Sequence, residues 1–327
     1  MNKKYTVGIV ILSLAISFAL YKLNYNSVNA SAFLTNLITV SGITTAIIIS
    51  YAANKMFQER TKRLNRELKI EELFSKITSF RKVAYYIAES DNLWDNYEDI
   101  TTFKNDENEF SYENIHNHQD DNNLILDFWN GNLPYNTSTI DFYLALQEII
   151  GDPNQDGWKF DPVYKSEYTL TEIEKLYDPS NQLWYYLFHE NNTETIHDGS
   201  VNKLFEPYFS KELKNIDTKY TYLNDIPTII AKLGSDFHEE YLPKAYSLMK
   251  KNLAPLPTHF QLLINILLII IIFGIILPLG HFWSDHAIVS DLILIFSTGF
   301  SITSLISLFF VLKMFIRREV RFDKYTS

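Results

Sequence analysis

Four stretches of this sequence contain no charged residue and approach or exceed the length needed to cross a lipid bilayer. An α-helix rises about 1.5 Å per residue, so about 20 residues cover the hydrocarbon core of about 30 Å. The run Ile269–Ile272 and its neighbours are apolar on every side, whereas a helix of a soluble core keeps a polar face. The sequence therefore predicts two membrane hairpins near the chain ends, with spans at about residues 5–23, 32–53, 260–279 and 292–312.

The first of these spans has a second interpretation. A short basic start followed by an apolar core also describes a secretory signal peptide, with Ala30, Ser31 and Ala32 as its small-residue cleavage site. Residues 21–30 form an unusually long connection between the apolar core and that site, which favours a retained span.

The positions of Lys and Arg predict the orientation of the chain. These residues are frequent at 55–69, 244–251 and 313–324, whereas the hairpin loops 23–31 and 280–291 contain none. Positive charge is retained on the cytoplasmic side of a membrane. The abundance of Asn, Ile, Lys and Tyr is typical of a bacterium with an AT-rich genome. We therefore expect a multi-pass protein of the bacterial inner (plasma) membrane, with both termini and the central domain in the cytoplasm.

The central part of the chain is strongly acidic. Residues 71–240 contain 33 acidic and 12 basic residues, a net charge of −21 in a chain of net charge −10. Such a surface repels nucleic-acid phosphates, so we expect no direct nucleic-acid binding and a partner that is basic, neutral or a metal ion. The chain has no Cys, which excludes disulfides, thiol nucleophiles, thiolate zinc sites and iron–sulfur clusters.

Residues 54–90 are predicted to continue the second span as a helical stalk, because residues 43–130 contain no Gly or Pro. Apolar residues recur there at steps of mostly three or four, with charged residues between them: Leu64, Leu68, Leu73, Ile77, Phe80, Ala84 and Ile87. This stripe packs either on its own domain, the simpler interpretation, or on the same stripe of a second subunit in a homo-oligomer.

Residues 91–258 are predicted to form an acidic cytoplasmic helical domain, followed by the second hairpin at 259–314 and a basic tail at 315–327. The segment 91–123 is poor in aliphatic residues and is expected to be a loop. Thr139–Ile150 reads as a helix, Thr169 and Glu172 form a capping box, and Pro243 is expected to kink a helix or start a new one. Strand-like alternation is absent, so the predicted fold class is all-α.

Three motifs resemble parts of metal sites. Asp152, Asn154 and Asp156 precede Gly157 as in the first half of a calcium loop, but position 12 of that loop is Val163. A turn rich in Asp, Asn and Gly is the simpler account.

The other two motifs place a carboxylate and an imidazole one helical turn apart, as in the helices of di-iron carboxylate proteins. They are Glu113 with His116 and Glu194 with His197. Because His and Glu are common in this chain, two such pairs are only slightly more than chance gives. Calcium or another divalent metal is thus a minor hypothesis, and no cofactor is predicted.

The second and fourth spans carry an unusual number of polar residues for membrane helices. The most prominent are Asn36, Ser41, Thr45, Ser297, Ser301, Thr303 and Ser307. Their four-residue spacing suits close packing of helices, which is the favoured interpretation, while the alternative is a hydrated pathway. No ionisable residue lies in either span. Asn36 is expected to pair across helices with Asn265.

The sequence favours no enzyme class and assigns no catalytic residue, because GxSxG, GxxxxGK[ST] and GxGxxG motifs are all absent. We expect a cytoplasmic domain that senses or binds a partner and acts on the membrane spans, in the manner of a pore-forming effector of the defence or toxin type. The alternative is a membrane-anchored scaffold or accessory subunit that recruits a cytoplasmic partner.

Overall fold

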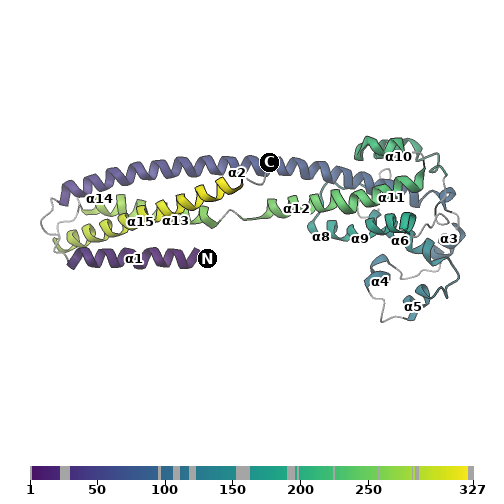
Figure 1. Cartoon of the computed structure of the whole chain (residues 1–327), viewed down its shortest axis with the longest axis horizontal. Helices are drawn as coiled ribbons and strands as arrows, with labels where there is room; N and C mark the ends of the chain where they lie inside the picture. Colours follow the sequence, from purple (N-terminus) through teal and green to yellow (C-terminus); the bar gives the residue numbers. More distant parts are fainter. Residues whose placement is uncertain are drawn as a thin grey trace. The chain divides into compact units, whose positions relative to one another are not determined.

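The computed structural model describes residues 2–22, 30–94, 97–105, 111–117, 123–151, 163–189, 196, 199–223, 225–255, 258–281, 283 and 287–322. Every regular element in these ranges is a helix, and they contain no β-strand. The all-helical prediction is therefore confirmed. The chain divides into two compact units, which are Met1–Lys62 with Pro255–Ser327 and Arg63–Ala254 (Figure 1).

The first unit, called the membrane bundle below, gathers the apolar helices from both ends of the chain. These are α1 (Asn2–Lys22), the first part of α2 (Ala30–Ala88), α13 (Thr258–Ile271), the π-helix η5 (Ile272–Ile276), α14 (Leu277–His281) and α15 (Ala287–Phe322). Both α1 and α13 lie against α15 (Figure 1). Phe273 of η5 stacks on Phe300 of α15, with their ring centroids 4.0 Å apart.

Three helices among the described residues are long and apolar enough to cross a membrane: Ser31–Ala88, Phe260–Gly280 and Asp291–Val311. They contain the predicted second, third and fourth spans. The predicted first span forms the helix α1 but is not one of the three. The membrane character of the chain is thus supported, while a fourth span stays a prediction.

Helix α2 belongs to both units. Its 59 residues from Ala30 to Ala88 form one helix, as the absence of Gly and Pro predicts for the part beyond Gly42. The apolar stripe along it is divided: the side chains from Leu73 onward are buried, but Leu64 is 50% exposed and Leu68 is 64% exposed. The stripe therefore packs on its own domain only in its later part.

The second unit, called the helical domain below, surrounds the last turns of α2. Its α-helices are α3 (Tyr97–Asn105), α4 (Tyr112–Asn117), α5 (Asn123–Trp129), α6 (Thr137–Ile150), α8 (Leu170–Lys175), α9 (Tyr177–Trp184), α10 (Glu206–Ile216), α11 (Ile226–Asp236) and α12 (Leu242–Leu253). Shorter elements are the 3₁₀-helices η1 (Asp91–Leu93) and η3 (Thr218–Tyr222) and the π-helices η2 (Tyr185–His189) and η4 (Phe237–Tyr241). Aromatic side chains form part of its core, where the ring centroids of Phe80 and Phe237 stack 4.1 Å apart.

The expectation of a loop at 91–123 was wrong for the described part of that segment, which contains α3 and α4. Few aliphatic residues are needed there because aromatic side chains replace them. Phe103 of α3 is buried and meets the ring of Tyr135 edge to face, with centroids 5.6 Å apart. Such contacts add to the free energy gained by burying the rings themselves.

Two π-helices share a sequence signature. Both η4 and η5 are followed immediately by Leu-Pro, at Pro243 in α12 and at Pro278 in α14. A proline inside a helix has no N–H to donate, and its ring collides with the carbonyl group four residues earlier. A wider π turn just before the proline accommodates this conflict. The prediction that Pro243 starts a new helical piece is confirmed.

Two helix ends in the domain show how local sequence sets their limits. Helix α8 begins at the capping box that Thr169 and Glu172 were predicted to form. Helix α6 ends at Gly151, whose φ of 67° is unfavourable for other residues. The buried guanidinium of Arg81 donates to the carbonyl oxygens of Ile149 and Ile150 there, the first from Nε at 3.1 Å. Its charge also suits the negative end of the helix dipole.

Candidate functional site

The polar residues of the fourth span point into the membrane bundle. On α15, Ser297, Ser301 and Ser304 recur at steps of four and three, so they share one helix face, and all three are buried. On α2, Ser41 is buried and Thr45 lies one turn further along. We call Ser41, Thr45, Ser297, Ser301 and Ser304 the hydroxyl layer.

Glycines bring helices of the bundle into close contact. A Cβ on Gly274 of η5 would lie 2.7 Å from the Cβ of Ser41 and 3.4 Å from the Oγ of Ser301. α2, η5 and α15 therefore meet at the hydroxyl layer. On another face of α15, a Cβ on Gly299 would lie 3.0 Å from the backbone nitrogen of Ser17 in α1. Small residues at a helix interface permit such close contacts.

Hydroxyl groups of α15 differ in whether they have a partner. Thr298 and Thr303 donate to the carbonyl oxygens four residues earlier, each at 2.7 Å. In contrast, the hydroxyl oxygens of Ser297, Ser301 and Ser304 have no hydrogen-bond partner among the described residues. The same holds for the buried hydroxyl oxygen of Thr45. An unpaired hydroxyl in an apolar interior costs about 1–3 kcal/mol, so this layer is costly to keep dry.

An apolar layer follows the hydroxyl layer along the bundle. Its residues form one buried cluster: Ile48, Leu262, Leu263, Ile266, Ile270, Leu308 and Val311. Ile48 lies about one turn after Thr45 on α2, and Leu308 lies one turn after Ser304 on α15. Helix α13 reaches this layer at Ile270, one turn before Gly274. The two layers are thus stacked, and α2 passes the hydroxyl layer first and the apolar layer second.

The remaining residues of the predicted polar stripe occupy different environments. Thr303 is buried with its hydroxyl paired, and Ser307 is half-buried. Asn36 is exposed, and so is Asn265. The expected pairing of these two side chains was wrong, since no hydrogen bond joins them. Of the predicted stripe, Ser41, Ser297 and Ser301 are therefore the serines that lie in the interior of the bundle.

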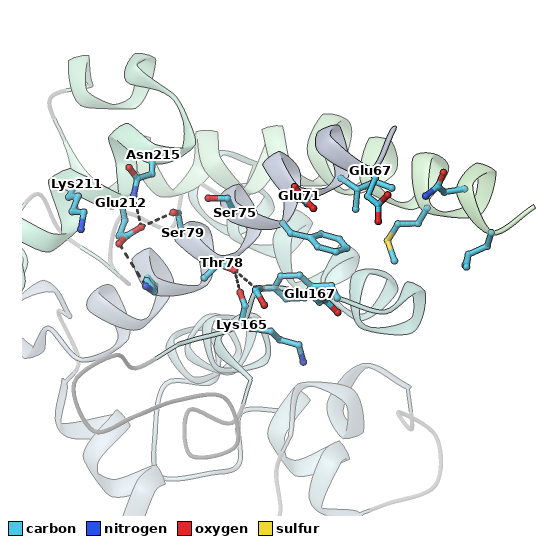
Figure 2. Close-up of a pocket in the computed structure, with 18 residues that line it drawn as sticks. Glu67, Glu71, Ser75, Thr78, Ser79, Lys165, Glu167, Lys211, Glu212 and Asn215 are labelled. Carbon is cyan, nitrogen blue, oxygen red and sulfur yellow. Dashed lines mark hydrogen bonds and ion pairs between the residues drawn. The ribbon is translucent and has the colours of Figure 1, made fainter. Parts of the chain in front are cut away.

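The helical domain has a groove of about 890 Å³. Four segments line it, from α2, from residues 165–168, from α10 and from the end of α12 (Figure 2). Thr78 holds the second segment on α2 by donating to the carbonyl oxygen of Lys165 at 2.6 Å. At one end the buried carboxylate of Glu212 accepts hydrogen bonds from Ser79 at 2.6 Å and Asn215 at 3.1 Å. We call this feature the domain groove.

A second polar cluster surrounds Asp141, which is completely buried on α6. Its carboxylate contacts the Nε2 of His116 at 2.9 Å and accepts hydrogen bonds from Gln182 at 3.4 Å and from the hydroxyl of Tyr186. The ring of Tyr112 packs on His116, with centroids 4.2 Å apart. Burial, reinforced by the charge of Asp141, raises the pKa of Tyr112 well above its ordinary value. The cluster fastens α4 and α9 to α6.

Glu113 and His116, which form one sequence motif, contact two different side chains of the domain. The Glu113 carboxylate lies 3.6 Å from the Nζ of Lys175, while His116 faces Asp141. The described part of the chain contains no group of three or more metal-ligating side chains. The calcium-loop residues Asp152, Asn154 and Asp156 lie outside the described residues, as do Glu194 and His197.

Sequence reasoning missed both the Asp141 cluster and the domain groove. A signal existed for the first, because Asp141 is the one charged residue among the apolar side chains from Ile140 to Leu146. A carboxylate in an otherwise apolar helix is expected to have buried partners.

No protein-family model matches the chain, and neither a curated protein nor a solved structure matches it. The case for a function therefore depends on these residues alone.

Proposed function

We propose that this protein is a membrane effector in which a cytoplasmic helical domain binds a partner and controls an ion pathway in the membrane bundle. The observation that carries the proposal is the hydroxyl layer, in which the buried oxygens of Thr45, Ser297, Ser301 and Ser304 have no hydrogen-bond partner among the described residues. Hydroxyl groups of this kind suit transient contact with water and with partly dehydrated ions. The apolar layer beside them suits a closed gate, because a narrow apolar constriction excludes water.

Helix α2 supplies the coupling in this proposal. The same uninterrupted helix contributes Ser41, Thr45 and Ile48 to the two layers and contributes Phe80 to the domain core. A continuous helix resists bending more than a loop does, so a shift or rotation of its domain part is carried along its axis. Binding of a partner to the domain then biases the packing of the bundle.

Ion flux through proteoliposomes tests the pathway. We expect the wild-type chain to be nearly ion-tight without its partner, and Ile48→Ser to leak because a polar side chain interrupts the apolar layer. Adding Ser301→Leu to that variant is expected to close the leak by filling the hydroxyl layer. Phe309→Ser provides the matched control, because Phe309 is exposed on the surface of α15. An ion-tight Ile48→Ser variant, correctly folded by circular dichroism, would contradict the proposal.

The close approach of helices at Gly274 and Gly299 favours a second candidate, in which the bundle is only an anchor and the domain is a scaffold. Under this alternative, Ser301→Leu affects stability alone, and Ile48→Ser stays ion-tight. The two candidate functions also predict different affinities for the partner. A scaffold binds its partner equally well whatever the state of the bundle, whereas a coupled effector binds with a different affinity when Ile48→Ser opens the bundle.

A further inference from the structure

We propose that the domain groove binds a basic, amphipathic helical segment of a partner protein. This inference names the chemistry of the partner and so rests on the proposed function. The groove combines an apolar floor with an acidic rim. The apolar residues that line it include Ile70 and Phe74 of α2 and Met249 and Leu253 of α12. Leu253 is 72% exposed, so this floor continues to an open, uncovered apolar edge.

The rim carries three carboxylates. Glu67 and Glu71 lie one turn apart on α2, and Glu167 lies on the 165–168 segment. All three are exposed, and no ion pair between described residues includes any of them. Figure 2 shows Glu67 and Glu71 at one end of the groove and Glu212 with Lys211 at the other.

No lysine that lines the groove forms an ion pair with Glu67, Glu71 or Glu167 among the described residues. Lys165 is 2.7 Å from Glu172, which lies outside the groove, and Lys82 is 4.0 Å from Glu212. Lys211 is exposed beside Glu212 at the far end. An occupant with basic groups at one end is therefore attracted in one orientation, with those groups near Glu67 and Glu71.

The length of the groove favours a helix as the occupant. From Glu67 to Lys82 the wall follows α2 over a rise of about 22 Å. A partner helix of three to four turns matches that length, with apolar residues at helical spacing on the floor and Lys or Arg facing the rim. The volume of about 890 Å³ is near the upper end for small-molecule pockets, and this site is an open groove.

Fluorescence anisotropy with the full chain in phosphatidylcholine nanodiscs tests the proposal. The probe is a labelled 14-residue helix of Leu and Lys on opposite faces, with empty nanodiscs as the blank. We expect Glu67→Gln with Glu71→Gln to weaken binding by about tenfold, since each exposed ion pair contributes up to about 1 kcal/mol. The matched control, Glu239→Gln with Glu240→Gln, removes the same charge from an exposed site on η4 and is expected to change affinity by less than about twofold.

Leu253→Ala and Leu204→Ala form a second matched pair, because both leucines are highly exposed and only Leu253 lines the groove. We expect only Leu253→Ala to weaken binding, by about threefold, through the loss of apolar contact. Equal losses in the two glutamate variants would overturn the proposal, since binding would then follow total charge. Absence of probe binding would overturn it too, as would equal binding of a peptide with the same composition in scrambled order.

Spermine tests the competing occupant. The helix proposal fails, and the groove is a polycation site, if three results are found together. Spermine displaces the probe, spermine binds more weakly to the Glu67→Gln, Glu71→Gln variant, and Leu253→Ala does not change the affinity for the probe. The flux assay separates this result from the proposed function. If the probe does not bind but Ile48→Ser still leaks, only the groove proposal fails. If the probe binds specifically but Ile48→Ser is ion-tight, only the proposed ion pathway fails.

Discussion

The buried carboxylates of the helical domain and the buried serines of the membrane bundle differ in their hydrogen bonding. In the domain, Asp141 has three partners and the buried Glu212 accepts hydrogen bonds from two residues. In the bundle, Ser297, Ser301 and Ser304 are also buried and have no hydrogen-bond partner among the described residues. Paired polar groups fix one arrangement of a core, whereas unpaired groups destabilise the arrangement that contains them. The two carboxylates therefore favour one packing of the domain around them, although the domain also contains an unpaired buried hydroxyl at Thr139. The serine face of α15 holds its packing less firmly, so we expect a second arrangement of the bundle to be within reach.

The strongest test of this contrast compares Asp141→Ala with Ser301→Ala. Removing the Asp141 carboxylate leaves buried donors without an acceptor, so we expect unfolding of the domain to require about 3 kcal/mol less free energy. Removing the Ser301 hydroxyl leaves no partner behind and relieves the cost of an unpaired buried group, so we expect stability to rise by about 1 kcal/mol. Urea unfolding followed by circular dichroism measures both. Similar losses in the two variants would break the comparison.

A pair of glycines tests how closely the bundle is packed. Gly274→Ala forces a Cβ against Ser41 and is expected to lower stability by about 2 kcal/mol. Gly42→Ala places its Cβ in open space on α2 and is expected to raise stability by up to about 1 kcal/mol, because Ala is the better helix former. Thermal denaturation in detergent provides the measurement. If Gly274→Ala also stabilises the chain, α2 and η5 do not meet as described.

A second pair of glycines tests the domain in the same way. Gly151 and Gly131 both have φ of 67°, so Ala at either position meets the same backbone strain. Only at Gly151 would the Cβ approach Arg81, at 2.8 Å from its Nη2. We expect Gly151→Ala to lose about 1 kcal/mol more than Gly131→Ala in urea unfolding. Equal losses would show that Arg81 does not need this space at the end of α6.

The smallest effect is expected at the capping box of α8. Partial burial opposes ionisation of Glu172, but hydrogen bonds from Lys165 and Thr169 outweigh it and lower the pKa of Glu172 to about 2. Because the folded pKa lies below the unfolded value, the stabilisation is complete above pH of about 4.5 and is lost as the pH falls towards 2. NMR titration of the Glu172 carboxyl carbon measures this directly. In Lys165→Met the pKa is expected to rise towards its ordinary value; an unchanged pKa would show that Lys165 has no part in it.

Features set by neighbouring residues were predictable from the sequence. The continuity of α2 follows from the missing Gly and Pro after residue 42, and the start of α8 follows from Thr169 and Glu172. Helix α6 begins at Thr137, two residues before the predicted start at Thr139, because the side chain of Asn136 accepts a hydrogen bond from the backbone of Thr139. Local chemistry of this kind acts over a few residues and so is visible in the sequence.

Features that join distant residues were not predictable. The partners of Asp141 lie 25, 41 and 45 residues away along the chain, and no local pattern links them. The groove likewise brings Glu67 together with Glu167 and Leu253 only after folding. The aromatic packing of Phe103 on Tyr135 overrides the loop-like composition around it. Tertiary contacts decide all three, since the gain from burial exceeds weak local preferences.

Access of water to the hydroxyl layer tests the central claim most directly. Because the chain contains no Cys, Ser301→Cys places a single thiol in this layer, and Phe309→Cys places one on an exposed side of the same helix, which the account expects to face lipid. The account predicts that a charged methanethiosulfonate reagent modifies the thiol of Ser301→Cys slowly in the otherwise wild-type chain and much faster when Ile48→Ser is added. Phe309→Cys is predicted to stay unreactive in both backgrounds. A thiol at position 301 that remains unreactive in a leaking Ile48→Ser variant would contradict the account, because the ions would then pass elsewhere.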